Sequence, residues 1–122
     1  MGILEKVRAH AGDVDFEVQP ELVSLLSSGD FGRYADEKGE MSVCFISNND
    51  ITGGNSGSAM FNARGELLGL AFDGNWEAMS SDILYEPKMQ RTIGVDVRYM
   101  LFMIEKYGKA GNLIQELKIT NP

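Results

Sequence analysis

Residues 49–74 read NDITGGNSGSAMFNARGELLGLAFDG, and this stretch decides how the middle of the chain folds. Its second half places apolar segments on either side of the turn sequence NARG (62–65), a pattern that predicts a β-hairpin. Its first half concentrates three glycines and two serines in the six positions 53–58, where a plain hairpin turn needs one glycine or two. This density predicts a loop whose backbone is arranged around one serine, Ser56.

The residues before this stretch predict two helices and a strand. Residues 3–10 carry apolar side chains at helical spacing and predict a short amphipathic helix. Pro20 suits the first turn of a second helix, which we expect to end near Gly29. Residues 41–47 (MSVCFIS) are rich in β-branched and aromatic side chains and predict a strand, in which we expect Cys44 to be buried. The expected buried face of the second helix consists of Leu22, Val23, Leu25 and Leu26.

The residues after the hairpin predict a further strand and a helical end. Residues 75–90 form a long irregular connection, and residues 91–97 (RTIGVDV) have the composition of a strand. From Arg98 the apolar spacing becomes helical until Gly108, a typical helix stop. The expected core residues of a short final helix are Leu113, Ile114 and Leu117. The order of elements predicts a mainly β fold with flanking helices.

Charge and composition exclude several functions. The chain has 18 acidic and 11 basic residues and a net charge of −7, which argues against binding nucleic acid. No run approaches the about 18 apolar residues of a membrane span, and no signal peptide is visible. A single cysteine cannot form an internal disulfide, and with one histidine a zinc site would have to be built from carboxylates. We therefore expect neither a metal nor a cofactor.

The glycine-rich loop suits a serine nucleophile. A serine hydroxyl needs a base to take its proton and donors to hold the oxyanion that forms. Gly54 and Gly57 permit a tight, partly left-handed backbone, and the amides of Gly54 and Ser56 are then candidate donors of an oxyanion hole. The pattern G-x-S-G between β-structures is typical of the chymotrypsin-type fold rather than of the α/β-hydrolases. On these residues alone, a Gly-Asn-Ser-Gly surface turn stays open as an alternative.

Longer motifs extend this interpretation to a family. The segments SNNDITGGNSGSAMFNARGELLGLAFDGNWEAMSSDI (47–83) and QRTIGVDVRYMLFMIEKYG (90–108) closely resemble the C-terminal part of the bacterial dipeptidyl-peptidase 7 and 11 family. These are serine exopeptidases of the chymotrypsin clan that remove dipeptides from free N-termini. The resemblance implies a fragment of a protein several times longer. It also implies the C-terminal half of a chymotrypsin-like double β-barrel in residues 41–97, after a helical and loop segment at 1–40 and before a helical segment at 98–122, all in one structural domain.

The resemblance assigns roles to residues of this sequence. It implies that Ser56 is the nucleophile and that the amides of Gly54 and Ser56 form the oxyanion hole. Asp73 matches a carboxylate that holds the free α-amino group of the substrate, although an aspartate before glycine is by itself a turn residue. Members that prefer acidic side chains carry a basic residue at the position of Gly74. Glycine there implies an uncharged pocket for hydrophobic side chains, as in dipeptidyl-peptidase 7.

The sequence leaves the roles of two aromatic residues near these positions undecided. Phe72 and Trp76 are either walls of the specificity pocket or residues of the core.

The chain departs from the family because it lacks the other two residues of the catalytic triad. The triad histidine and aspartate of the family lie in the N-terminal barrel half, and the one histidine here, His10, sits in an amphipathic segment, KVRAHAG. We therefore expect the isolated chain to be nearly inactive and to self-associate where the missing half would pack. The expected partners are that half and a peptide with a free N-terminus, and the full-length protein is expected in the periplasm, at the cell surface or outside the cell. Two alternatives stay open: a complete small hydrolase that uses His10 as its base, and a noncatalytic binding or assembly module.

Overall fold

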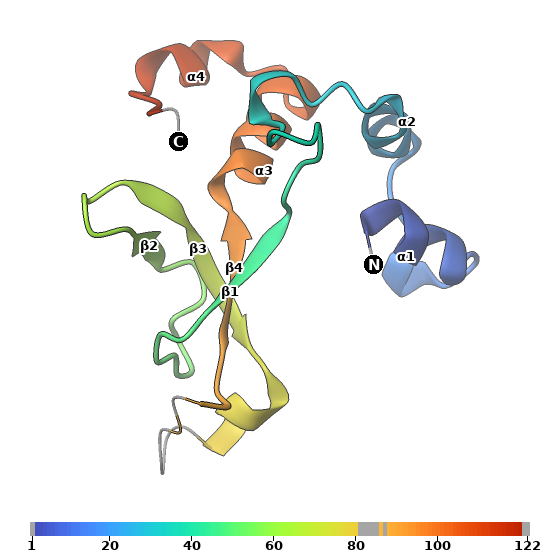
Figure 1. Ribbon diagram of the computed structural model, residues 1–122. Coiled ribbons are helices and arrows are strands. Elements are labelled where there is room, and N and C mark those ends of the chain that lie inside the picture. The colour runs from blue at the N-terminus through green and yellow to red at the C-terminus, as the bar shows by residue number, and fades with distance from the viewer. Residues whose placement is uncertain (1, 81–85, 87, 121–122) are drawn as a thin grey trace.

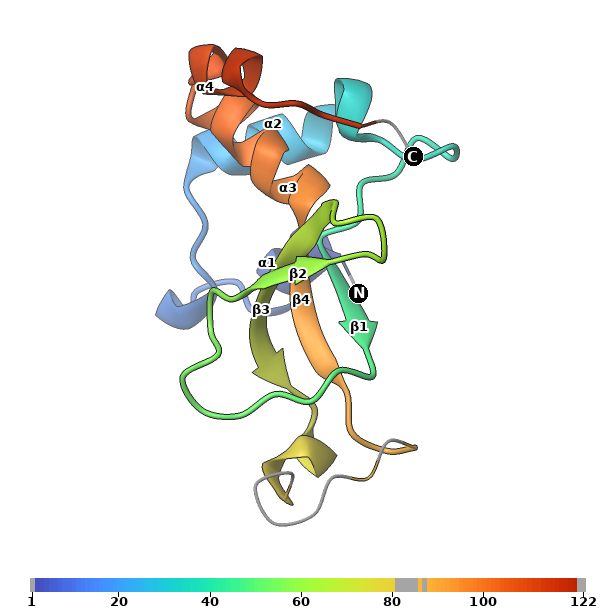
Figure 2. The ribbon, with the colours of Figure 1, turned by 90° about the vertical axis from the view of Figure 1, so that its left-hand side faces the viewer.

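A four-stranded antiparallel sheet forms the centre of the computed structural model, which describes residues 2–80, 86 and 88–120. The strand order is β1-β4-β3-β2, so β1 and β2 are the edge strands (Figures 1 and 2). The predicted hairpin is confirmed, because β2 pairs with β3 and Asn62 N–H donates to the carbonyl of Glu66 across the turn at 3.0 Å. The strands are β1 (Cys44–Ser47), β2 (Ala59–Phe61), β3 (Leu67–Gly74) and β4 (Thr92–Asp96).

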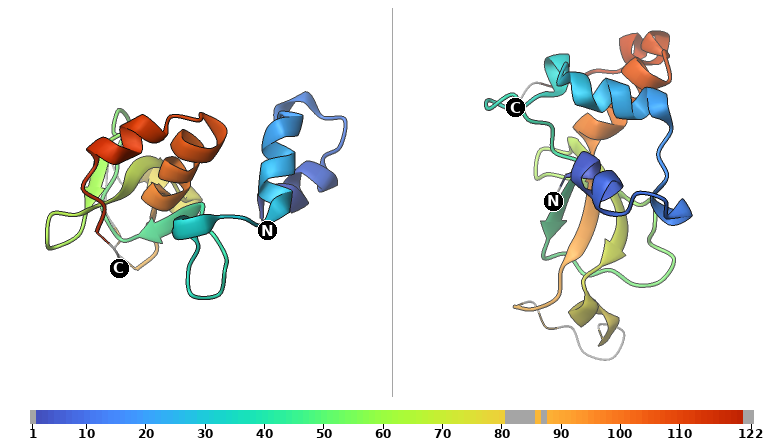
Figure 3. Two further views of the ribbon diagram at one scale, coloured as in Figure 1. Left: turned by 90° about the horizontal axis from the view of Figure 1, so that it is seen from above. Right: turned by 90° about the vertical axis from the view of Figure 1, so that its right-hand side faces the viewer.

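Helices gather at one end of the sheet and along one flank (Figures 1 and 3). Pro20 occupies the first turn of α2, and Gly29 ends it in the left-handed region at φ +68°, as the sequence predicts. None of the helices in the described ranges is long and apolar enough to cross a membrane. The α-helices are α1 (Ile3–Ala9), α2 (Pro20–Ser28), α3 (Val97–Phe102) and α4 (Gly111–Glu116). Shorter elements are the 3₁₀ helices η1 (Val14–Phe16), η2 (Gly32–Tyr34) and η3 (Trp76–Ser80) and the π-helical segment η4 (Met103–Tyr107).

The helical end has a small core around Phe102. Leu26 of α2, Tyr34 of η2 and Phe102 of α3 are buried against one another. The hydroxyl of Tyr34 donates to the carboxylate of Glu105 at 2.5 Å. Burial and this carboxylate raise the pKa of Tyr34 to about 12. These contacts connect the N-terminal helices to the C-terminal ones.

The expectation that α4 buries three apolar side chains is wrong for two of them. Ile114 is 5% exposed, whereas Leu113 and Leu117 are 49% and 51% exposed. The helix ends before Leu117, which is extended at φ −91° and ψ 138° and so leaves the helical face. Leu113 is adjacent to Ile114, and neighbouring residues of a helix point in different directions.

Glycines in the two central strands make room for side chains from both edges. A Cβ atom at Gly94 would lie 2.7 Å from the sulfur of Met60 and 2.8 Å from the ring of Phe45. Both contacts are far inside van der Waals distance, so the ring and the thioether occupy the space above Gly94. Side chains from the edge strands β1 and β2 thus cover Gly94 in the middle of the sheet.

The expectation that Cys44 is buried is wrong. Cys44 lies in β1 as predicted, but its side chain is exposed. Successive side chains of a strand point to opposite faces, so Phe45 packs over the sheet while Cys44 and Ile46 point away from it. The sequence pattern alone could not decide which face is covered.

Asp96 links the sheet to α3. Its carboxylate accepts the backbone N–H of Arg98 at 2.9 Å and caps the helix. The guanidinium of Arg98 donates to both carboxylate oxygens, at 3.0 and 2.7 Å. Burial opposes ionisation of Asp96, but these hydrogen bonds and the positive charge hold its pKa below the ordinary value.

Candidate active site

The loop that carries Ser56 is a compact turn closed on itself. The side-chain oxygen of Asn55 accepts the N–H of Thr52 at 2.9 Å, and the carbonyl of Asn55 accepts the N–H of Ser58 at 2.9 Å. Gly54 and Gly57 lie at φ +93° and +89°, a region that side chains disfavour. The backbone conformation therefore explains why glycine occupies positions 54 and 57. Ser56 lies between them and is exposed.

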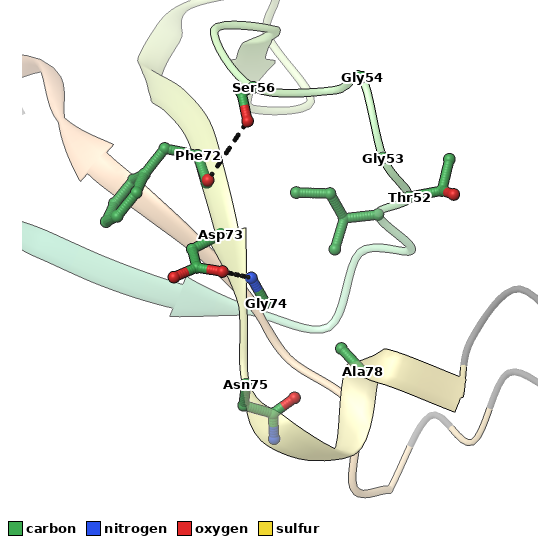
Figure 4. Close-up of a pocket in the computed structure, with 10 residues that line it drawn as sticks. Thr52, Gly53, Gly54, Ser56, Phe72, Asp73, Gly74, Asn75 and Ala78 are labelled. Carbon is green, nitrogen blue, oxygen red and sulfur yellow. Dashed lines mark hydrogen bonds between the residues drawn. The ribbon is translucent and has the colours of Figure 1, made fainter.

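Hydrogen bonds fasten this loop to β3. Gly57 N–H donates to the carbonyl of Ala71 at 2.7 Å, and Ala71 N–H donates to the carbonyl of Ser58 at 2.9 Å. The hydroxyl of Ser56 donates to the carbonyl oxygen of Phe72 at 3.4 Å (Figure 4). The serine is thus held against a specific point of the strand rather than at the tip of a free loop.

A β-bulge at Phe72 shapes that point. In the pairing of β3 with β4, Ala71 is opposite Gly94 and Asp73 is opposite Ile93, so Phe72 is an extra residue. A bulged residue drops out of the ladder and turns the strand locally. This leaves the carbonyl of Phe72 available to Ser56 and changes the direction of Asp73, the next residue.

All four residues predicted for the site line one pocket. The pocket has a volume of about 260 Å³ and lies between the serine loop and the end of β3 (Figure 4). Gly54 and Ser56 come from the loop, and Asp73 and Gly74 come from the strand. The loop and the strand, which are far apart in the sequence, therefore contribute residues to one pocket.

The pocket has one charged lining residue among those that the structure describes. Asp73 is exposed there, and one of its carboxylate oxygens accepts the N–H of Gly74 at 2.8 Å. A lone carboxylate beside a serine favours a cationic group in the pocket.

Two backbone amides of the loop are placed to receive an acceptor from outside. In the part of the chain that the structure describes, the N–H groups of Gly54 and Ser56 donate to no other group. A Cβ atom at Gly54 would have no atom within 4 Å, so this side of the loop is open. Both N–H groups can therefore donate to an acceptor from outside the described residues.

His10 is not part of the site. It caps the C-terminus of α1, and its ring stacks on Phe16 with a centroid distance of 4.0 Å. α1 lies along the flank of the molecule beside α2 (Figure 3), whereas the pocket lies at the end of β3. The structure therefore does not support the alternative in which His10 activates Ser56. Among the described residues, no group of three or more His, Cys, Asp and Glu side chains is placed to hold a metal.

The structure places the two aromatic candidates for the pocket wall, Phe72 and Trp76, differently. Phe72 lines the pocket and is 45% exposed, whereas Trp76 is 80% exposed and is not among the lining residues. Trp76 therefore belongs neither to the pocket wall nor to the core.

The sequence did not indicate five further lining residues of the pocket: Ile51, Thr52, Gly53, Asn75 and Ala78. The side chain of Asn75 donates to the carbonyl of Met89 at 2.8 Å and accepts the N–H of Arg91 at 2.8 Å. These partners lie well beyond Asn75 in the sequence, so no local pattern indicates them. A small residue such as Ala78 carries no sequence signal of its own.

Comparison with known proteins identifies the family. Residues 1–119 match the family model described as Peptidase S46. The chain belongs to the S46 peptidase family. Over 118 residues it is 58% identical to dipeptidyl-peptidase 7 of Porphyromonas endodontalis, which covers 97% of this chain and 14% of that protein. It is 49% identical over 118 residues to an Asp/Glu-specific dipeptidyl-peptidase of Capnocytophaga gingivalis, which covers 97% of this chain and 16% of the relative.

A solved dipeptidyl-peptidase structure contains a region with the same fold. The crystal structure of Porphyromonas endodontalis DPP11 in complex with the dipeptide Arg-Asp superposes on this chain with a TM-score of 0.90 at 44% identity. The match covers 96% of this chain and 16% of that protein. This S46 chain thus spans a small part of the length of the relatives it matches.

Proposed function

We propose that this chain is the nucleophile-bearing part of an S46 serine dipeptidyl-peptidase that releases dipeptides from free N-termini. The observation that carries the proposal is the meeting of Ser56, Gly54, Asp73 and Gly74 in one pocket of a chain that belongs to this family. The proposal is also supported by relatives that match almost the whole chain and are dipeptidyl-peptidases by name.

Ser56 is the proposed nucleophile. Its oxygen forms a bond to the carbonyl carbon of the second substrate residue, and the proton of the hydroxyl passes to a base and then to the leaving amine as the peptide bond breaks. Water then hydrolyses the ester and releases the dipeptide. The amides of Gly54 and Ser56 hold the oxyanion, since they have no partner among the described residues.

The base must come from outside these 122 residues. The only histidine of the chain is remote from Ser56, so we assign the base to a histidine of the longer protein. The hydroxyl that donates to Phe72 would then turn toward that imidazole.

Asp73 is the proposed anchor for the substrate's α-amino group. A carboxylate and an ammonium form a charge-assisted hydrogen bond, and a fixed carboxylate beside the nucleophile counts residues from the end of the chain. Asp73 and Ser56 line the same pocket, as this role requires.

Gly74 adds no charged side chain to the part of the pocket that is proposed to receive the second substrate residue, whereas the carboxylate of Asp73 is assigned to the α-amino group. Without a side chain at 74, nothing there pairs with an acidic substrate, and apolar lining from Ile51, Phe72 and Ala78 favours a hydrophobic one. We therefore place the preference nearer dipeptidyl-peptidase 7 than the Asp/Glu-specific enzymes.

The sheet is proposed to be the C-terminal half of a chymotrypsin-like double barrel. Its edge strands carry exposed apolar side chains, with Ile46 67% and Phe61 60% exposed. Exposed edge strands with apolar side chains can pair with another segment, and the N-terminal half of the longer protein is the proposed partner. By its family the full-length protein is proposed to act in the periplasm, at the cell surface or outside the cell.

A pair of assays tests the function. The full-length S46 peptidase that carries this sequence should release dipeptides from a chromogenic substrate, and Ser56→Ala should reduce the rate by about 10⁴-fold or more. The isolated 122-residue chain should be no faster than its own Ser56→Ala variant, because it lacks the base. Turnover by the full-length enzyme that survives Ser56→Ala would leave a noncatalytic binding or assembly module as the better description.

A further inference from the structure

Gly74 has no room for a side chain, although its backbone would accept one. Its φ lies outside the left-handed region that favours glycine. A Cβ atom at this position would lie 2.9 Å from Cβ of Ala78, 3.6 Å from Cγ2 of Ile51 and 3.7 Å from the carbonyl oxygen of Arg91. Carbon atoms pack at about 3.5–4.0 Å, so only the contact with Ala78 is a clash. Space, rather than backbone conformation, requires glycine at 74.

Ala78 is held in this position by a chain of hydrogen bonds. Its N–H donates to the carbonyl of Asn75 at 2.9 Å, and the N–H of Asn75 donates to the carbonyl of Arg91 at 2.9 Å. The side chain of Asn75 adds bonds to the backbone of Met89 and Arg91, both at 2.8 Å. Figure 4 shows the methyl group of Ala78 directed from η3 toward Gly74. The 3₁₀ turn cannot move away from Gly74 without breaking this network.

We propose that Ala78 is a specificity-determining residue of the pocket that acts jointly with Gly74. This inference rests on the proposed function, in which the pocket holds the second side chain of the substrate. The methyl group of Ala78 occupies the space that the first carbon of any side chain at 74 needs. The pair therefore excludes a side chain at 74, and with it a basic group that could pair with an acidic substrate side chain, and a larger or charged residue at 74 requires glycine at 78.

The coupling is measured first with the smallest possible side chain. In the full-length S46 peptidase, the variants are Gly74→Ala, Ala78→Gly and the double variant, and the readouts are urea unfolding and kcat/KM on a substrate with leucine second. Overpacking should reduce kcat/KM of Gly74→Ala by about tenfold, and Ala78→Gly should restore it in the double variant. Ala63→Gly in the hairpin turn is the control for the general cost of an alanine-to-glycine change. Full activity and stability of Gly74→Ala, or a loss that Ala78→Gly does not relieve, would overturn the proposal.

Specificity is measured with a charged side chain. Gly74→Arg alone should lose activity on both leucine and glutamate substrates, whereas Gly74→Arg with Ala78→Gly should raise the glutamate-to-leucine ratio of kcat/KM by about tenfold or more over the single variant. An equal ratio in the single and double variants would remove Ala78 from the specificity pocket. If the ratio stays constant while Ser56→Ala still abolishes turnover, the proposed function stands and only the role of Ala78 fails. Turnover that survives Ser56→Ala removes the proposed function itself.

Discussion

The hydroxyl of Ser56 lies 3.4 Å from the carbonyl oxygen of Phe72, a residue 16 positions further along the chain. The contact is possible because Phe72 is a bulged residue whose position in the ladder has no opposite partner on β4. Asp73 follows directly, so the same bulge places a carboxylate beside the serine. Two backbone irregularities, the glycine loop and the bulge, therefore build the candidate site together.

Gly54→Ala should reduce activity far more than stability. The backbone at φ +93° disfavours alanine, and relaxing it would rotate the amide that is proposed to hold the oxyanion. We expect kcat of the full-length peptidase to fall by about a hundredfold. Steady-state kinetics with a dipeptidyl substrate measures this loss.

The hairpin offers a matched control for this variant. Gly65 also has a positive φ, +75°, and open space where a Cβ atom would be, but it lies in the turn between β2 and β3. Gly65→Ala should cost about 1 kcal/mol of stability and leave kcat unchanged. Equal kinetic losses in Gly54→Ala and Gly65→Ala would show that strain, and not the oxyanion donor, explains the effect.

Asp73→Asn should weaken the use of substrates with a free N-terminus. The variant keeps the shape of the side chain but removes the charge that is proposed to pair with the ammonium group. A hydrogen bond to a charged group contributes about 1.5–3 kcal/mol, so kcat/KM should fall by about tenfold to a hundredfold. Asp50→Asn, an exposed carboxylate outside the pocket, should have no such effect. Wild-type kcat/KM in Asp73→Asn would disprove the anchor role.

Local sequence signals predicted the elements, and contacts between distant segments decided the rest. Pro20 and the turn at 62–65 act through their own backbone preferences, so the helix start and the hairpin could be predicted. Cys44 was assigned the wrong exposure because strand alternation does not say which face is covered. Asp73 and Gly74 were found by resemblance to a family, whereas their direction depends on the bulge, for which the sequence carries no signal. Ala78 acts only through a contact with Gly74.

Asp96 should make stability sensitive to acid. The pKa of Asp96 is lowered in the folded chain, so the ionised carboxylate contributes stability at pH values above its unfolded pKa of about 3.9. This contribution is lost as the pH falls through the lower folded pKa. Urea unfolding of the chain between about pH 2 and 6 should show a steeper acid loss for the wild type than for Asp96→Asn.

The same variant should also be less stable at neutral pH. Asparagine can still cap the helix, so the loss is that of the ion pair with partly exposed Arg98, which should cost about 1 kcal/mol. Asp30→Asn removes an exposed carboxylate from a loop and serves as the control. An identical pH profile in Asp96→Asn and the wild type would mean that the pair with Arg98 adds nothing to the fold.

The isolated chain should self-associate through its sheet edges. Ile46 on β1 and Phe61 on β2 are 67% and 60% exposed, and both strands lie at an edge of the sheet where backbone groups can pair with another chain. The net charge of −7 opposes association, but charges separated by more than about 8 Å are screened at physiological salt. Sedimentation equilibrium over a concentration series should therefore give a mass above that of the monomer.

Substitutions on the edge strands distinguish association through the sheet edges from nonspecific association through other exposed apolar side chains. Ile46→Lys and Phe61→Lys place a charge on each edge strand and should shift the chain toward the monomer, because inward or edge lysines block strand pairing. Val14→Lys changes a side chain that is 75% exposed in η1, away from the sheet, and should leave the mass unchanged. If the wild type is a monomer at high micromolar concentration, or if Val14→Lys dissociates it as well as Phe61→Lys, the sheet edges are not a self-association surface.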